Sequence, residues 1–214
     1  MTKIPHSGEL RIPTRLLSTA LAQKKTKALR ILATAKLDGH RSDIKTLCEV
    51  LKMHPKTISR QIKTLVNDGM AGTDGTYLFP RAWSVMKFNK RGGLYLIDAP
   101  KNLKKFEALC FAKGLKKILS SKASPIRPDR GRTKQNSDLP ATYLTKALGL
   151  KERRFKTLKS EAQRYRYISV IPQFRIIGKA QDYQALKKNL HDMPIFKRGK
   201  HTVVPDVSKI RVLI

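Results

Sequence analysis

One pattern of apolar residues occurs twice in this chain of 214 residues, and it limits the possible folds more than any other feature. Between residues 43 and 68, apolar side chains recur every three to four positions, with a break at Met53-His54. This spacing predicts two consecutive helices that each bury one face. The same pattern returns 97 positions later without a gap. We therefore expect two units of similar fold.

Four pairs of inward-facing positions define the repeat: Leu47 with Leu144, Leu51 with Leu148, Ile58 with Phe155, and Leu65 with Ala162. The same offset predicts a short hairpin after each pair of helices: it matches Tyr77 with Phe174 and Phe79 with Ile176, and it sets Asp74-Gly75 over Ile171-Pro172. The repeat is one of pattern and not of identity. It therefore predicts two similar folds without requiring a recent duplication.

For the first unit, residues 1–100, we expect an opening segment at 10–21, a scaffold helix at 24–37, helices at 43–52 and 55–68, and two strands within 70–79. Ser42 is the expected N-cap of the helix at 43–52, and Pro55 suits the first turn of the next helix. Asp74-Gly75 is expected at the turn between the strands, because this dipeptide readily adopts the positive φ angles of a tight hairpin. A further hairpin is expected to join 82–88 with 94–97 around a basic tip at 89–93.

For the second unit, residues 101–178, we expect helices at 102–119, 140–148 and 151–164 and strands at 167–171 and 174–177. Residues 120–137 lose this periodicity and hold five basic residues against Asp129 alone, so they are expected to form a basic loop. Residues 179–214 add a helix at 180–190 and strands at 201–204 and 210–214, as a cap on the second unit or a dimer contact. The expected fold class is mainly α with small β-hairpins (α+β).

The charge of the chain indicates a polyanionic partner. It has 46 Lys and Arg against 15 Asp and Glu, a net charge of +31, and a compact state with this charge repels itself unless a polyanion or counterions screen it. No run of 18 apolar residues and no signal or lipidation motif occurs, so we expect a chain in the cytoplasm that does not bind membrane. Cys48 and Cys110 lie far apart within helical patterns, which favours reduced, buried thiols.

Residues 24–80, with two helices followed by a hairpin, resemble a winged helix-turn-helix, and residues 102–178 resemble it more loosely. Tandem units of this kind in a small, very basic chain are similar to the replication initiators of plasmids and phages, or to transcription regulators carried by such mobile elements. The resemblance implies that the second helix of each unit lies in the major groove of duplex DNA, while the first helix and the wing hold phosphates. It also implies a location on the nucleoid.

The second helix of each unit carries a polar, mostly basic outer face. We expect these faces to bind DNA through Lys56, Thr57, Ser59, Arg60, Gln61, Lys63, Thr64, Arg153, Arg154, Lys156, Thr157, Lys159 and Ser160. The arginines suit guanine, and Gln61 suits adenine. Further phosphate contacts are expected from the basic loop, through Arg127, Arg130, Arg132 and Lys134.

Several alternatives remain open at this point. The faces are also compatible with ordinary solvated helices, with protein-interaction modules or with a homodimer. RNA binding and nonspecific packaging of the nucleoid also suit the charge. An enzyme is not expected, because the carboxylates are scattered and no phosphate-cradling Gly-x-x-x-x-Gly-Lys-Ser/Thr or His-Glu-x-x-His segment occurs. No metal and no cofactor are expected, and His54 is expected to be a helix-start residue and not a ligand.

Overall fold

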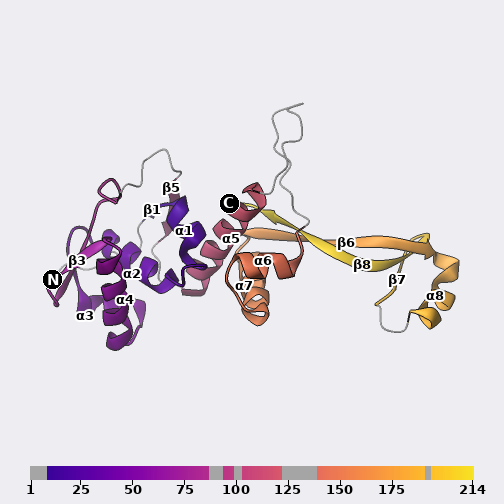
Figure 1. Ribbon diagram of the computed structural model, residues 1–214, viewed down its shortest axis with the longest axis horizontal. Coiled ribbons are helices and arrows are strands. Elements are labelled where there is room, and N and C mark those ends of the chain that lie inside the picture. The colour runs from indigo at the N-terminus through magenta and orange to yellow at the C-terminus, as the bar shows by residue number, and fades with distance from the viewer. Residues whose placement is uncertain (1–8, 87–93, 99–102, 122–138, 191–193) are drawn as a thin grey trace, which may run out of the picture.

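The computed structural model describes residues 9–86, 94–98, 103–121, 139–190 and 194–214. Within them the chain forms eight α-helices and three antiparallel sheets, so the fold is mixed α and β, as expected. Figure 1 shows an elongated molecule, with the N-terminal helices at one end and a long two-stranded ribbon leading to the other. The helices α5 and α7 lie between these ends.

The elements of the first unit occur in the predicted order. They are α2 (Thr26–Leu37), β2 (Ser42–Asp43), α3 (Ile44–Leu51), α4 (Pro55–Asn67), β3 (Ala71–Thr73) and β4 (Tyr77–Pro80). The strands form one sheet in the order β2-β4-β3, and the turn between β3 and β4 contains Asp74-Gly75 as predicted. The predicted pair of helices and the hairpin after it are confirmed.

The helix starts differ from prediction at one position. Asp43, and not Ser42, caps α3, since its carboxylate accepts hydrogen bonds from the Lys45 and Thr46 backbone N–H groups at 3.2 and 3.1 Å. Ser42 is fully buried in β2, and its hydroxyl donates to the Ala35 carbonyl at 3.1 Å. His54 caps α4 by accepting the Lys56 N–H at Nδ1, which confirms it as a helix-start residue.

The second hairpin expected in the first unit is wrong. Strand β5 (Leu94–Asp98) pairs with β1 (Glu9–Pro13), 81 to 89 positions away, and residues 83–86 form a turn. This turn packs against β1, because the Trp83 indole N–H donates to the Arg11 carbonyl at 3.0 Å. The expected basic tip at 89–93 lies outside the described residues. Helix α1 (Thr14–Ala20) follows β1 directly.

The second unit repeats the helices of the first. It contains α5 (Leu103–Ser121), α6 (Ala141–Ala147), α7 (Glu152–Arg164) and β6 (Ile168–Lys179). Helix α7 begins and ends 97 positions after α4. All eight side chains of the four predicted pairs are at most 3% exposed, so the predicted inward faces are confirmed. The expected basic loop at 120–137 lies outside the described residues beyond Ser121.

The hairpin predicted around Ile171-Pro172 is wrong. Strand β6 runs through these residues and pairs along its length with β8 (His201–Val212), with a register shift between Ile171 and Gln173. A bulge of this kind accommodates Pro172, whose missing N–H would otherwise interrupt the ladder. The strands expected at 201–204 and 210–214 are thus one strand, which reaches Val212, and the segment expected as a cap or dimer contact contributes a strand to the sheet of the second unit.

The remaining elements lie at the far end of this ribbon. A 3-10 turn (Ala180–Asp182) and α8 (Tyr183–Asn189) stand where one helix at 180–190 was predicted. A short strand that the sequence did not predict, β7 (Phe196–Arg198), pairs with β8 and completes a sheet of order β6-β8-β7.

Helix α5 joins the two predicted units into one hydrophobic core. Eight consecutive residues, Ala108–Leu115, are buried, so this helix is covered on all sides. It packs against α1 and α2 on the side of the first unit and against α7 on the other, where the Phe111 and Phe155 rings meet edge to face at 5.3 Å. A Cβ atom on Gly114 would lie 2.7 Å from Leu148 Cδ2 and 3.4 Å from the Ser18 carbonyl oxygen. A side chain at this position would therefore require the buried Leu148 side chain to shift.

We expect Gly114→Ala to lower the free energy of unfolding by up to about 2 kcal/mol, because overpacking a core costs about 1–3 kcal/mol and the higher helix propensity of Ala returns about 1 kcal/mol. Chemical denaturation measures this change. In a Leu148→Ala background the same substitution should be neutral or stabilising, since the crowded methyl group is gone. Lys117→Ala, on an exposed position of α5, is the control. A Gly114→Ala protein more stable than wild type would contradict the close packing.

Lys113 brings a cation into the same helix. The residue is 6% exposed, and burial, together with the charge of Lys116, lowers the pKa of its ammonium from 10.5 to about 8. Between these two values the unfolded chain holds more protons than the folded one, so the contribution of Lys113 to stability rises with pH. Below pH 8 the folded state carries the full cost of the buried charge.

We therefore expect Lys113→Met to be more stable than wild type at pH 7 and to lose part of this advantage between pH 8 and 10.5. The pH-dependent part is at most about 3 kcal/mol, and denaturation at several pH values measures it. Lys117→Met controls for the general effect of removing one positive charge. An advantage that stays constant up to pH 10.5 would show that the Lys113 ammonium is not disfavoured by the fold.

Candidate nucleic-acid interface

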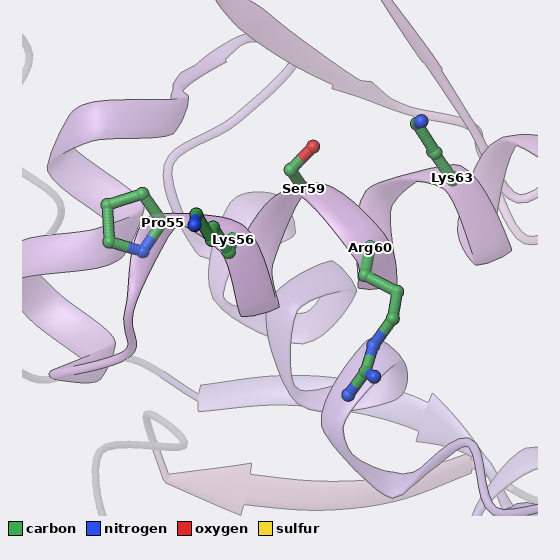
Figure 2. A pocket seen from close by; sticks show the side chains of 5 residues that line it. All are labelled: Pro55, Lys56, Ser59, Arg60 and Lys63. Atoms are coloured by element: carbon green, nitrogen blue, oxygen red, sulfur yellow. The ribbon is translucent and has the colours of Figure 1, made fainter.

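The outer face of α4 is a basic surface on a well-anchored helix. Ile58, Ile62 and Leu65 fix the inner face, each at most 4% exposed. On the opposite side Lys56, Ser59, Arg60 and Lys63 are exposed and, with Pro55, line a shallow open depression (Figure 2). The helical spacing that buries the apolar face of α4 thus leaves these four residues, which were predicted to bind DNA, exposed to solvent.

The other three residues predicted on α4 lie at the flanks of this face. Thr57, Gln61 and Thr64 are half-buried, and the Thr64 hydroxyl donates to the Arg60 carbonyl at 3.2 Å. This hydrogen bond uses the only donor of the Thr64 side chain within its own helix. Thr64 can still accept a hydrogen bond from a ligand, but it is less available than Ser59.

The α4 face presents three cations to solvent. Within the described part of the chain, none of Lys56, Arg60 and Lys63 forms an ion pair. The acid closest in sequence, Asp68, binds Lys25, with Nζ 2.7 Å from the carboxylate. Lys56 also lies in the first turn of α4, where the positive end of the helix dipole adds to the attraction for anions. The face is therefore open to a polyanion.

The outer face of α7 is more committed to contacts within the protein. Lys156 pairs with Glu152 at 2.7 Å, and this contact lowers the pKa of the Glu152 carboxyl. The Thr157 hydroxyl donates to the Arg153 carbonyl at 3.0 Å. Of the predicted residues here, Arg153, Lys156, Thr157 and Ser160 are exposed and Lys159 is half-buried. Arg153 and Lys159 form no ion pair within the described residues.

Arg154 has a structural contact that the sequence did not predict. Its guanidinium binds the carboxylate of Glu107 on α5, whose side chain is 14% exposed. Arg30 of α2 lies near the same carboxylate: burial lowers the pKa of Arg30, and the charge of Glu107 opposes this change. Glu107 therefore stands between cations from both units. The guanine contact expected of Arg154 would require this ion pair to open.

A further basic side chain lies beside the hairpin of the first unit. The Arg41 guanidinium stacks 3.5 Å from the centre of the Tyr77 ring. The turn itself holds an acid, Asp74, which accepts the Thr76 and Tyr77 N–H groups at 2.9 and 2.7 Å, and these bonds lower the pKa of its carboxyl. Arg41, and not the acidic turn, would therefore make any phosphate contact at this hairpin. Arg41 lies outside the predicted helices, so the helical pattern could not identify it.

The four residues expected to add phosphate contacts from the basic loop lie outside the described residues: Arg127, Arg130, Arg132 and Lys134.

Both α4 and α7 reach the lower edge of the molecule in the view of Figure 1. The structure thus brings the described part of the predicted site onto two helices that are held by one core.

No protein-family model, curated protein or solved structure matches this chain. Among the described residues, no helix is long and apolar enough to cross a membrane. In the same part of the chain, no group of three His, Cys, Asp or Glu side chains gathers where a metal ion could be held.

We expect Arg60→Ala to weaken duplex DNA binding by about 1–3 kcal/mol and to relax sequence preference, with thermal stability unchanged because the side chain is exposed. Ile58→Asp, at a fully buried position of the same helix, should instead unfold the first unit. Fluorescence anisotropy with labelled duplexes and thermal unfolding by circular dichroism separate the two effects. If Arg60→Ala leaves the binding profile unchanged, the outer face of α4 does not read DNA.

Proposed function

We propose that this chain is a sequence-specific, double-stranded DNA-binding protein with two winged helix-turn-helix units. The observation that carries the proposal is the exposed outer face of α4, with three cations that have no acidic partner among the described residues. The net charge of +31 supports a polyanionic ligand of considerable length.

The order of elements in the first unit supports this reading. A scaffold helix, a short strand, two helices joined by three residues, and a hairpin follow one another from α2 to β4. In a winged helix-turn-helix the second helix of the pair lies in the major groove, and the first helix and the wing hold the backbone. In this arrangement Arg60 and Gln61 contact base edges, while Lys56 and Lys63 hold phosphates.

The second unit supports a second contact on the same duplex. Its helices α5, α6 and α7 take the places of α2, α3 and α4, and the ribbon of β6 and β8 stands where the wing would be. Arg153, Lys159 and Ser160 would supply most of its contacts, because Arg154 and Lys156 are paired within the protein. We infer that the first unit contributes more to base recognition than the second.

In cellular terms, we propose a transcription regulator or replication initiator of a phage or plasmid, acting on the nucleoid in the cytoplasm and without catalytic activity. The tandem units and the strongly basic chain are what favour this class. The two recognition helices on one chain would contact successive groove segments of a single site.

The test is selection from a randomised duplex library at several salt concentrations, with structured RNA as competitor. We expect an enriched motif that spans two adjacent groove segments, and a loss of enrichment within one segment when Arg60 is replaced by Ala. Affinity should fall steeply with salt, because each neutralised phosphate releases condensed counterions. Duplex binding without enrichment would indicate packaging, and displacement by RNA would overturn the proposal.

A further inference from the structure

The ribbon of β6 and β8 carries a separate module away from the main core (Figure 1). Each strand has 12 residues, so the ribbon extends roughly 40 Å. The main core includes Ile168, Ile210 and Val212 at its near end. Ile195, Val203 and Val204 are also buried but do not belong to that core. We call the far part, residues 174–206, the distal module.

One face of the sheet in the distal module is covered by α8. A Cβ atom on Gly178 of β6 would lie 2.8 Å from Leu186 Cδ1, so helix and strand are in close contact. The Lys197 ammonium of β7 lies 5.2 Å from the centre of the Tyr183 ring on the same helix. This face therefore has its packing partner within the chain.

The opposite face is apolar and has no cover among the described residues. The rings of Phe174 and Phe196 meet edge to face at 6.3 Å, and the Arg198 guanidinium lies 3.8 Å from the centre of the Phe174 ring. Ile176 and Phe196 both stand opposite Val203 in the ladder, so they flank it on one face. Ile176 is 59% exposed and Phe196 is 46% exposed. Two large apolar side chains are thus presented to solvent side by side with an arginine.

The charge of the distal module as a whole selects the kind of partner. The distal module has three acids, Asp182, Asp192 and Asp206, against seven cations: Arg175, Lys179, Lys187, Lys188, Lys197, Arg198 and Lys200. The Asp182 carboxylate also accepts the backbone N–H of Lys179 at 3.2 Å. A second copy of the chain on this face would bring like charges together, whereas a polyanion would complement them.

We propose that the open face of the distal module, with Ile176, Phe196 and Arg198, inserts into the minor groove of duplex DNA beside the site contacted by α4 and α7. This inference rests on the proposed duplex binding. Proteins that bind the minor groove place apolar side chains between base steps and cationic ones along the phosphates, and they bend the duplex in doing so. The length of the ribbon allows the module to reach DNA about one helical turn beyond the contact of α7.

The experiment compares the full-length wild type with Ile176→Ser/Phe196→Ser, with Arg198→Ala and with the control Val85→Ser, which changes a 64% exposed residue of the first unit. Affinity for a duplex of about 40 base pairs is measured by anisotropy, and bending by energy transfer between dyes at its two ends. Circular dichroism confirms that each variant is folded, and sedimentation gives its oligomeric state. All measurements use the selected site, or a mixed-sequence duplex if no motif is enriched.

We expect the double variant to bind roughly tenfold more weakly and to lose the bend, and Arg198→Ala to weaken binding with the bend retained. Val85→Ser should match wild type, and Arg60→Ala should relax sequence preference but still bend DNA. If the double variant and Arg198→Ala bind and bend DNA like wild type, this inference about the distal module is overturned, while the proposed function still stands. A wild-type dimer that the double substitution dissociates would also overturn it, because the face would then hold a second copy. A wild type that does not bind duplex DNA would overturn both proposals.

Discussion

The packing of α5 between α1 and α7 holds the whole arrangement together. A helix buried on all sides must find partners in every direction, and α5 finds them in the first unit on one side and in the second unit on the other. Because Gly114 has no side chain, α5 lies close to its neighbours on both sides, and the Phe111 ring packs against the Phe155 ring of α7. The two helix pairs are therefore fixed relative to one another by core packing and not by a flexible linker.

Electrostatics distinguishes α4 from α7, two helices of 13 residues at matching positions of the repeat. Helix α4 has its cations on the outside and without an acidic partner in the described part of the chain, whereas on α7 Arg154 binds Glu107 and Lys156 binds Glu152. Breaking the first of these pairs would leave a carboxylate that is largely removed from water, which is costly in a protein interior. The exposed pair of Lys156 and Glu152 is worth much less and can give way to a ligand. The same scaffold thus provides one face ready for a polyanion and one that is partly committed to the core.

The helices could be predicted from sequence because their signal is local. Apolar residues at helical spacing identified α3, α4, α6 and α7, and all eight inward positions of the repeat are buried. Their outer faces followed by elimination, so most residues of the candidate site were correctly predicted to be exposed or at its flanks. Partners distant in sequence have no such signal, and this is why the contact of Arg154 with Glu107 was not foreseen.

Strand partners were the main failure, for a related reason. The sequence of a strand shows the alternation of its apolar and polar residues but not which strand lies beside it. Strand β5 was therefore predicted to pair with residues 82–88, the nearest segment in sequence, although it pairs with β1. The repeat offset predicted a turn at Ile171-Pro172, yet β6 continues through these residues and a bulge accommodates the proline. The open apolar face of the distal module exists only once β6, β7 and β8 are side by side, so no single stretch of sequence could indicate it.

The pairing of Glu9 with Asp98 bears on how the chain acquires its fold during synthesis. Residues 26–80 make their helix and hairpin contacts over short sequence separations, which form early and fast. The segment containing β1 and α1 is made before β5 and α5, so Ile12 and Leu17 cannot be fully buried until these later elements have been synthesised. A nascent chain that has not yet reached α5 would therefore expose this apolar segment, in the period when ribosome-bound proteins are most prone to aggregate and most in need of chaperones.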